Sequence, residues 1–150
     1  MDEEDESTIV ASFAKNSREV ICVGISRWQG KQRLFVRLYA QSPDAQQPVP
    51  TKEGVTLPVE QYQALLDGVR ALAEAGGKEV VTAKIPKNKS QQVWVGANIY
   101  KEIPLVYIRT YAAFVGSQEL KPAKQGVSIR AELYPKLLEA VESLGKALDG

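Results

Sequence analysis

The chain contains one sequence unit twice. Residues 7–76 align with residues 79–148 at a constant offset of 72 positions, with 20 identities in 70 pairs and no gap. Unrelated sequences of this composition would share roughly four identities over that length. The identical positions include Lys15-Asn16 with Lys87-Asn88, Gly24 with Gly96, Arg37 and Tyr39 with Arg109 and Tyr111, and Leu65-Leu66 with Leu137-Leu138. A constant period without insertions means one supersecondary unit used twice, so we predict a pseudo-symmetric pair.

Each repeat is predicted to form four strands followed by one helix. Apolar or alternating segments in the first copy predict strands at Thr8–Phe13, Val20–Trp28, Leu34–Tyr39 and Gly54–Leu57, the last after a polar, proline-bearing loop. Apolar residues at helical spacing then run to Leu72, after Pro58 in the first helical turn. The expected fold class is α+β: two tandem β-β-β-β-α repeats with curved antiparallel sheets and packed helices, an intramolecular pseudo-dimer. Its expected parts are an acidic disordered tail (1–6), a first repeat (7–76) and a second repeat (79–148).

Composition limits the chemistry available to the chain. One cysteine, Cys22, excludes an internal disulfide, and the absence of histidine removes the usual zinc ligands and the commonest general base. No apolar run reaches the length of a membrane span, and no signal-peptide pattern is present. We therefore expect a non-enzymatic protein without cofactor, metal or membrane partner, located in the cytoplasm or nucleoid, or in the nucleus if the source is a eukaryote.

The charge is unevenly distributed. The segment Asp2–Glu6 holds five of the 18 acidic residues, so 19 basic residues face 13 acidic ones in the rest of the chain, a net charge of +6. Two interpretations of the acidic segment stay open. It is either a solvated tail or a competitor that occupies the basic surface when no polyanion is bound.

The face of the sheet opposite the predicted core carries cations and rings in alternation. Because successive side chains of a strand point to opposite faces, residues with the same parity share a face. In the first copy this face shows Arg33, Phe35, Arg37 and Tyr39, with Trp28 on the neighbouring strand; in the second it shows Tyr107, Arg109 and Tyr111, with Trp94 and Tyr100. Gly24 and Gly96, in the middle of equivalent strands, indicate a bend or a close backbone approach.

Alternating rings and cations on an open sheet are typical of surfaces that bind single-stranded nucleic acid. Unpaired bases stack on the rings while the cations follow the phosphates, and duplex DNA exposes no base faces for such stacking. The same face could instead pack on a partner sheet, with its rings forming a second core. It could also dock another protein, as the interaction surface of a coactivator-type adaptor.

The end of each repeat resembles the positive cofactor four family of single-strand-binding transcriptional coactivators. The segment Glu119–Ile129, followed by Glu132-Leu-Tyr134 and a leucine-rich helix, is similar to the loop, strand and helix of that family. The Ser26–Lys31 turn and the Val106–Tyr111 strand are similar to the family's aromatic-Lys-Gly-Lys turn and Ile-Arg-x-Tyr strand. Whirly and Pur-type single-strand binders share this general architecture.

The resemblance implies a fold, a partner and a set of contact residues. The family's curved sheets pair as a dimer, which a tandem chain would supply covalently, and its partner is single-stranded DNA; RNA and the transcription machinery are further expected partners. The implied strand-contacting residues are Trp28, Lys31, Arg37 and Lys52 in the first copy and Tyr100, Lys101, Arg109, Lys121 and Lys124 in the second. The chain departs from the family where a tryptophan would follow the Arg-x-Tyr pair, since Ala40 and Ala112 stand there.

Overall fold

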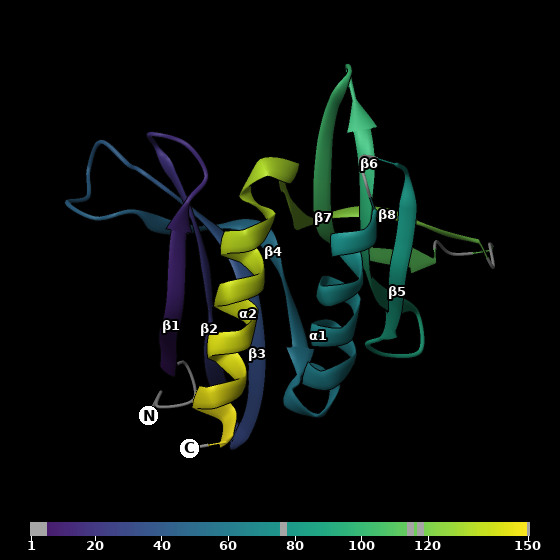
Figure 1. The fold of residues 1–150 in the computed structure, drawn as a ribbon. Helices are drawn as coiled ribbons and strands as arrows, with labels where there is room; N and C mark the ends of the chain where they lie inside the picture. Colours follow the sequence, from purple (N-terminus) through teal and green to yellow (C-terminus); the bar gives the residue numbers. More distant parts are fainter. Residues whose placement is uncertain (1–5, 76–77, 114–115, 117–118, 150) are drawn as a thin grey trace.

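Two four-stranded antiparallel sheets, each followed by a helix, make up the computed structural model of the protein, which describes residues 6–75, 78–113, 116 and 119–149 (Figure 1). The first sheet has the order β1-β2-β3-β4, with β1 Glu6–Ala14, β2 Glu19–Trp28, β3 Lys31–Ala40 and β4 Val49–Pro58. The second has the order β5-β6-β7-β8, with β5 Val80–Pro86, β6 Gln91–Tyr100, β7 Ile103–Ala113 and β8 Leu120–Arg130. The predicted α+β class and tandem arrangement are confirmed.

A short 3-10 turn leads from each sheet into its helix. Turn η2 (Val59–Gln61) precedes α1 (Tyr62–Ala71), which η3 (Leu72–Glu74) extends; turn η4 (Ala131–Leu133) precedes α2 (Tyr134–Asp149). None of the helices that the structure describes is long and apolar enough to span a membrane.

The repeat extends to the irregularities of the sheets. The pairing of β1 with β2 shifts between Ile9 and Ala11, and that of β5 with β6 shifts between Val81 and Ala83, 72 positions later. A second shift, between β3 and β4, recurs in the same way between β7 and β8. Such bulges bend a strand and increase its twist, so both sheets curve at matching places.

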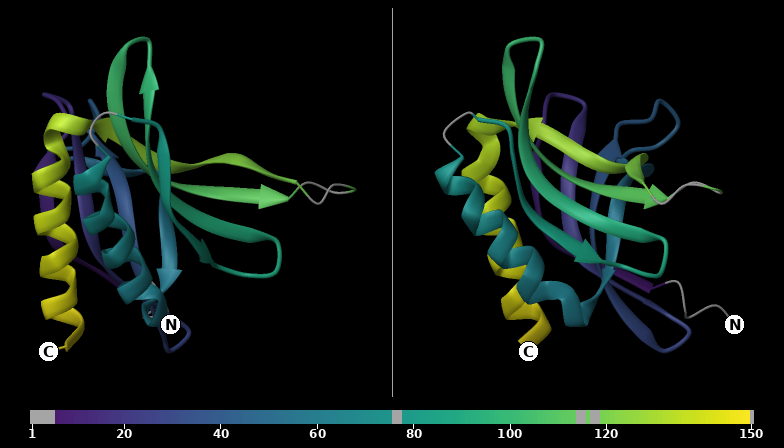
Figure 2. Two further views of the ribbon diagram at one scale, coloured as in Figure 1. Left: turned by 45° about the vertical axis from the view of Figure 1, so that its right-hand side comes forward. Right: turned by 90° about the vertical axis from the view of Figure 1, so that its right-hand side faces the viewer.

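Each helix covers the sheet of the other repeat. Helix α1 packs on β5 and β6, whereas α2 packs on β1 and β2 (Figures 1 and 2). The approach of α1 is close: the hydroxyl of Thr82 donates to the carbonyl of Gly68 at 2.8 Å, and a Cβ on Gly68 would lie 2.6 Å from that of Ala83. The absence of a side chain at Gly68 therefore allows this contact.

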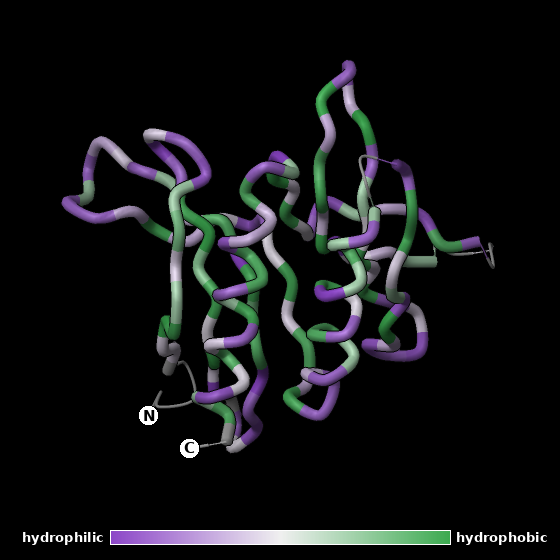
Figure 3. Tube along the Cα trace, in the orientation of Figure 1, coloured by the Kyte–Doolittle hydropathy of each residue, from purple (hydrophilic) through white to green (hydrophobic). Residues whose placement is uncertain are grey.

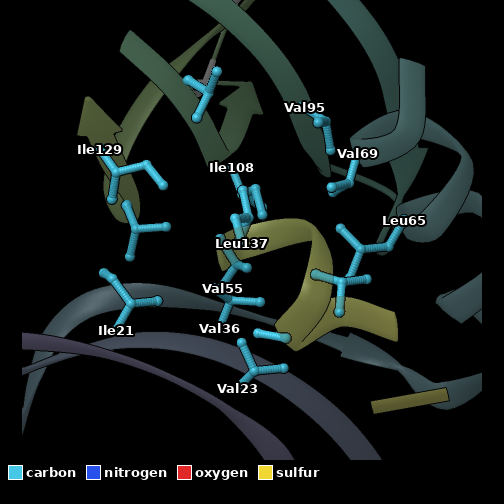
Figure 4. Close-up of a cluster of buried hydrophobic side chains, with 14 of the residues drawn as sticks. Ile21, Val23, Val36, Val55, Leu65, Val69, Val95, Ile108, Ile129 and Leu137 are labelled. Carbon is cyan, nitrogen blue, oxygen red and sulfur yellow. The ribbon is translucent and has the colours of Figure 1, made fainter. Parts of the chain in front are cut away.

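Both repeats share one hydrophobic core. Ile21, Val23, Val36 and Val55 from the first sheet lie opposite Ile108 and Ile129 from the second, with residues of both helices beside them (Figure 4). Hydrophilic residues gather instead in the turns between strands (Figure 3). Because the core is continuous across the two repeats, neither repeat buries its apolar face alone.

Several boundaries differ from the sequence-based expectation. Pro58, expected in the first helical turn, is the last residue of β4, and the 3-10 turn η2 separates it from α1. Strand β4 begins at Val49, so Pro50 and Lys52 lie in a strand and not in the predicted loop; Pro50 is the pairing partner of Tyr39, next to the bulge. Proline is tolerated there because β4 is the last strand of its sheet and lies at a bulge. Of the predicted acidic tail, residues 1–5 lie outside the described residues, and Glu6 is the first residue of β1.

Candidate nucleic-acid interface

The outward face of β3 has the composition that the sequence predicts. Leu34, Val36 and Leu38 point into the core and are buried. Arg33, Arg37 and Tyr39 are only partly covered, on the opposite face. In the second sheet, Arg109 and Tyr111 of β7 are likewise partly covered. The structure therefore groups these residues on the side of each sheet that faces away from the core.

Two of the predicted stacking rings are largely covered. Phe35 is 4% exposed and Tyr107 is 7% exposed. Each ring lies over the mid-strand glycine of the neighbouring strand, since a Cβ on Gly24 would be 2.6 Å from Cζ of Phe35 and one on Gly96 would be 2.7 Å from Cζ of Tyr107. The expected close backbone approach is found as well, because the same Cβ atoms would meet the backbone oxygens of Thr8 and Val80. The two rings form the floor of the faces.

Tyr107 has an altered ionisation. Burial, followed by the charge of Tyr111 and a hydrogen bond with it, raises the pKa of Tyr107 to about 12. The neutral phenol is therefore the form that the folded protein favours.

The two repeated arginines reach across to the next strand. Nη1 of Arg37 donates to the carbonyl of Thr51 at 2.9 Å, and Nη1 of Arg109 donates to the carbonyl of Ala123 at 3.1 Å. Both carbonyls belong to the bulged part of the last strand, where the regular ladder is interrupted. The arginines thus stabilise the bulges, and Nη2 of Arg109 also donates to the hydroxyl of Ser128 at 3.3 Å.

A stack of two rings and a cation marks the second sheet. The rings of Trp94 and Tyr111 are parallel within 9°, with centroids 3.8 Å apart, and Nζ of Lys84 lies 4.4 Å from the tryptophan centroid. The indole N–H donates to the side-chain oxygen of Gln92 at 2.8 Å. Sequence reasoning placed Trp94 and Tyr111 on this face but did not include Lys84.

The other predicted contact residues lie at the ends and edges of the sheets. Lys31 begins β3 and is exposed, beside Trp28 in the strand pairing; the side chain of Trp28 lies outside the described part of the structure. Tyr100 is 60% exposed, with Nζ of Lys101 at 5.3 Å from its ring centroid. The exposed lysines of the last strands are Lys52 in β4 and Lys121 and Lys124 in β8.

Two lysines outside the predicted contact residues, Lys15 and Lys87, border these faces. The β5–β6 turn of the second repeat is attached to the first repeat, because Nε2 of Gln61 donates to the carbonyl of Pro86 at 2.9 Å. Partial burial, followed by the positive charges of Arg33 and Arg37, lowers the pKa of the adjacent Lys87. The sequence of one repeat does not indicate which residues of the other repeat it contacts, so this position of Lys87 could not be predicted.

Open grooves run along both faces. The larger, about 820 Å³, holds three cations and one carboxylate, and is lined by Arg27, Gly30, Lys31, Gln32, Arg33, Pro58, Val59 and Glu60. On the second sheet a groove of about 390 Å³ is lined by residues that include Tyr100, Leu105, Tyr107, Arg109 and Tyr111. Next to it, a groove of about 410 Å³ adds Lys15, Asn16 and Arg130 to Tyr100 and Leu105.

Comparison with known proteins finds one family model and several solved structures that match part of the chain. Residues 15–68, within the first repeat, match the model of the family Transcriptional Coactivator p15 (PC4). No curated protein sequence matches this chain significantly. Among solved structures, a PC4 homologue from Burkholderia pseudomallei in a tetragonal crystal form is 22% identical, with a TM-score of 0.39, over 43% of this chain and 94% of its own.

A second, orthorhombic crystal form of the Burkholderia protein gives a TM-score of 0.38 over 43% of this chain and 85% of its own. The bacteriophage T5 homologue of PC4, implicated in recombination-dependent DNA replication, is 16% identical over 48% of this chain and 90% of its own, with a TM-score of 0.34. The resemblance predicted from the sequence is confirmed: the first repeat of this chain matches the PC4 transcriptional coactivator family, and the second repeat has the same strands and helix.

Proposed function

We propose that this protein binds single-stranded nucleic acid, with DNA as the main partner, on the outward faces of its two sheets. The observation that carries the proposal is the position of the repeated arginines and rings. Arg37 and Arg109 lie on the face opposite the core in both sheets, each next to a tyrosine two residues further along its strand. The helices cover the other side of the sheets (Figure 2).

Each group on these faces has a separate task in this proposal. Lysine and arginine side chains bind phosphates, and each contact releases counterions from the strand. The accessible rings, Tyr100 and the Trp94–Tyr111 pair, stack on unpaired bases, which is worth about 1–3 kcal/mol per base. The buried rings, Phe35 and Tyr107, support the faces from below. A duplex, whose bases are already stacked, gains only the phosphate contacts.

A protein-interaction role is the second candidate. Ile99 is 45% exposed and Tyr100 is 60% exposed, side by side near the β6–β7 turn, which extends beyond the rest of the second sheet (Figure 1). Exposed apolar side chains at a projecting turn also suit a protein partner, such as a component of the transcription machinery. For a DNA-binding protein of this family we propose a location at the nucleoid, or in the nucleus of a eukaryote.

Titration of a fluorescent 20-nucleotide single strand tests the proposal. We expect tighter binding to the single strand than to a duplex of the same length. With about four to six phosphates engaged, log K should fall with log salt at a slope of roughly −3 to −4. A single-stranded RNA of the same sequence decides between the two nucleic acids. Equal affinity for duplex and single strand, or no binding at micromolar protein, would favour the protein-interaction role.

A matched variant controls for general charge effects. Lys136 is exposed on α2, on the helix side of the molecule. Lys136→Ala removes one positive charge without changing either outward face. It should leave the affinity and the salt slope close to those of the unmodified protein, whereas Lys31→Ala should reduce both.

A further inference from the structure

At two equivalent places, a turn of one repeat meets the outward face of the other. The first junction consists of Lys87, from the β5–β6 turn, with Arg33 and Arg37 of β3. The second junction consists of Lys15 and Asn16, from the β1–β2 turn, with Tyr100 and Leu105 of the second sheet. The 72-residue offset relates the two junctions, since Lys15 corresponds to Lys87 and Leu105 corresponds to Arg33.

The first junction collects positive charge. Gln61 attaches the β5–β6 turn to the first repeat through the carbonyl of Pro86, at 2.9 Å. This bond places Lys87 at one end of β3, just as Lys15 lies in one groove with Leu105, the counterpart of Arg33. Consistent with this position, partial burial and then the charges of Arg33 and Arg37 lower the pKa of Lys87. Positive charges that are near one another and partly out of water repel unless an anion lies between them.

The second junction holds fewer uncompensated positive charges, since its groove is lined by Lys15 and Arg130 only. Lys15 lies 3.9 Å from the carboxylate of Glu19, whereas Gln91, an uncharged residue, occupies the corresponding position beside Lys87. Leu105 stands where the first sheet has Arg33, and Ile103 stands where it has Lys31. The groove here therefore has an apolar side, formed by Ile103, Leu105 and the exposed ring of Tyr100, with the amide of Asn16, Lys15 and Arg130 at its polar side.

We propose that the two junctions have different ligands: the first binds a phosphate group of a nucleic-acid strand, and the second binds one of its bases. This rests on the proposed function. Lys87, Arg33 and Arg37 would surround the phosphate from both repeats, which needs the tandem arrangement. The base would stack on Tyr100 and pack against Leu105, within reach of a hydrogen-bonding amide. A symmetric pair of identical repeats would instead have two equal junctions.

The test exchanges the residues that distinguish the junctions. Arg33→Leu gives the first junction the residue of the second, and Leu105→Arg makes the reverse change. For each variant, affinity is measured over a range of salt concentrations for a 20-nucleotide thymidine strand and for an abasic strand of equal length. The salt slope reports phosphate contacts, and the ratio of the two affinities reports base contacts.

We expect Arg33→Leu to reduce the salt slope by about 0.7, one phosphate contact on a single strand, while the ratio of affinities stays the same. Leu105→Arg should lower that ratio by about fivefold or more, the equivalent of one lost stacking contact, without reducing the slope. Tyr100→Ala should have the same effect on the ratio, and because Tyr100 is 60% exposed the fold should tolerate it.

The outcomes separate this inference from the proposed function. If the unmodified protein binds neither strand, the proposed function fails. If it binds the thymidine strand but Arg33→Leu and Leu105→Arg alter the same quantity in the same direction, the junctions are equivalent and only the present inference is overturned. Melting curves recorded for each variant identify any that unfold, and Tyr100→Ala and Lys87→Gln then replace them in the same comparison.

Discussion

The hydroxyl of Tyr62 donates a hydrogen bond of 2.7 Å to the backbone carbonyl of Val141, and its counterpart Tyr134 donates one of 2.7 Å to the carbonyl of Val69. Each tyrosine lies at the start of one helix and each carbonyl lies in the other helix. Tyr62 and Tyr134 are equivalent in the two repeats, and so are Val69 and Val141. An interface in which equivalent residues make the same contact in both directions is isologous. The two repeats of one chain thus pair in the manner of a twofold dimer.

Loss of either tyrosine hydroxyl should weaken this pairing. Tyr62→Phe and Tyr134→Phe each remove a donor whose bond has a typical net value of about 0.5–1.5 kcal/mol. Urea denaturation should show a lower free energy of unfolding for each variant, by a similar amount because the two bonds are equivalent. Tyr100→Phe, which removes a hydroxyl from a ring that is 60% exposed, should have no effect. A change confined to one of the two helical variants would contradict the symmetry.

An isolated repeat should not fold as a monomer. The helix of residues 7–76 covers the other sheet in the intact chain, so a fragment of residues 1–76 would leave the apolar face of its own sheet without α2. It should either remain unfolded or form a homodimer that restores the missing helix. Light scattering after size-exclusion chromatography and circular dichroism distinguish these states. A folded, monomeric fragment would show that the shared core is unnecessary.

The sequence predicts which residues form the faces but not which parts meet. The offset of 72, the alternation in β3 and the helical spacing of Leu65, Leu66 and Val69 define the elements and their apolar sides. Both helices carry the same apolar pattern, however, so the sequence alone cannot show that each one covers the other repeat's sheet. For the same reason, the sequence does not predict that Lys87 lies near Arg33 and Arg37.

The alternation of residues along a strand predicts which face of the sheet a side chain lies on, but it does not predict how exposed that side chain is. Phe35 and Tyr107 point outward as predicted, but the neighbouring glycines leave space that each ring fills, so both are buried. Pro50 belongs to the proline-bearing segment that was predicted to be a loop before Gly54, because proline lacks a backbone donor. It lies in β4 because a bulged last strand of a sheet has positions that need no donor.

The arginines of the outward faces should contribute to binding through charge and to stability through hydrogen bonds. Arg37→Ala with Arg109→Ala should reduce the salt slope for single-stranded DNA by about 1.4, two contacts. Arg37→Lys with Arg109→Lys keeps both charges and should preserve the slope. Both pairs lose the hydrogen bonds to Thr51 and Ala123, so both should lower the melting temperature slightly. If Arg37→Lys with Arg109→Lys reduced the salt slope as much as the alanine variant, binding would not depend on the charge of these residues alone.

Stability at alkaline pH should depend on Tyr107. Its pKa is raised from 10.0 to about 12 in the folded protein, so the folded state holds the phenol proton more tightly than the unfolded state. The protonated phenol therefore contributes to the free energy of unfolding. This contribution is complete below pH 10 and is lost as the pH rises from about 10 to 12, and the loss is at most about 3 kcal/mol. The free energy of unfolding of Tyr107→Phe should therefore fall less between pH 8 and pH 12 than that of the unmodified protein. Urea denaturation at intervals of half a pH unit measures the difference, with Tyr100→Phe as the control.

Lys87 should affect stability and binding in opposite directions. Without a bound anion, its charge faces Arg33 and Arg37, so Lys87→Gln should leave the free protein as stable as before or slightly more stable. The same variant should bind single-stranded DNA more weakly and reduce the salt slope by about 0.7. Lys15→Gln is the matched control, because the carboxylate of Glu19 lies 3.9 Å from Lys15 and already offsets its charge; its slope should change less. A lower melting temperature for Lys87→Gln with an unchanged slope would assign this lysine a structural role instead.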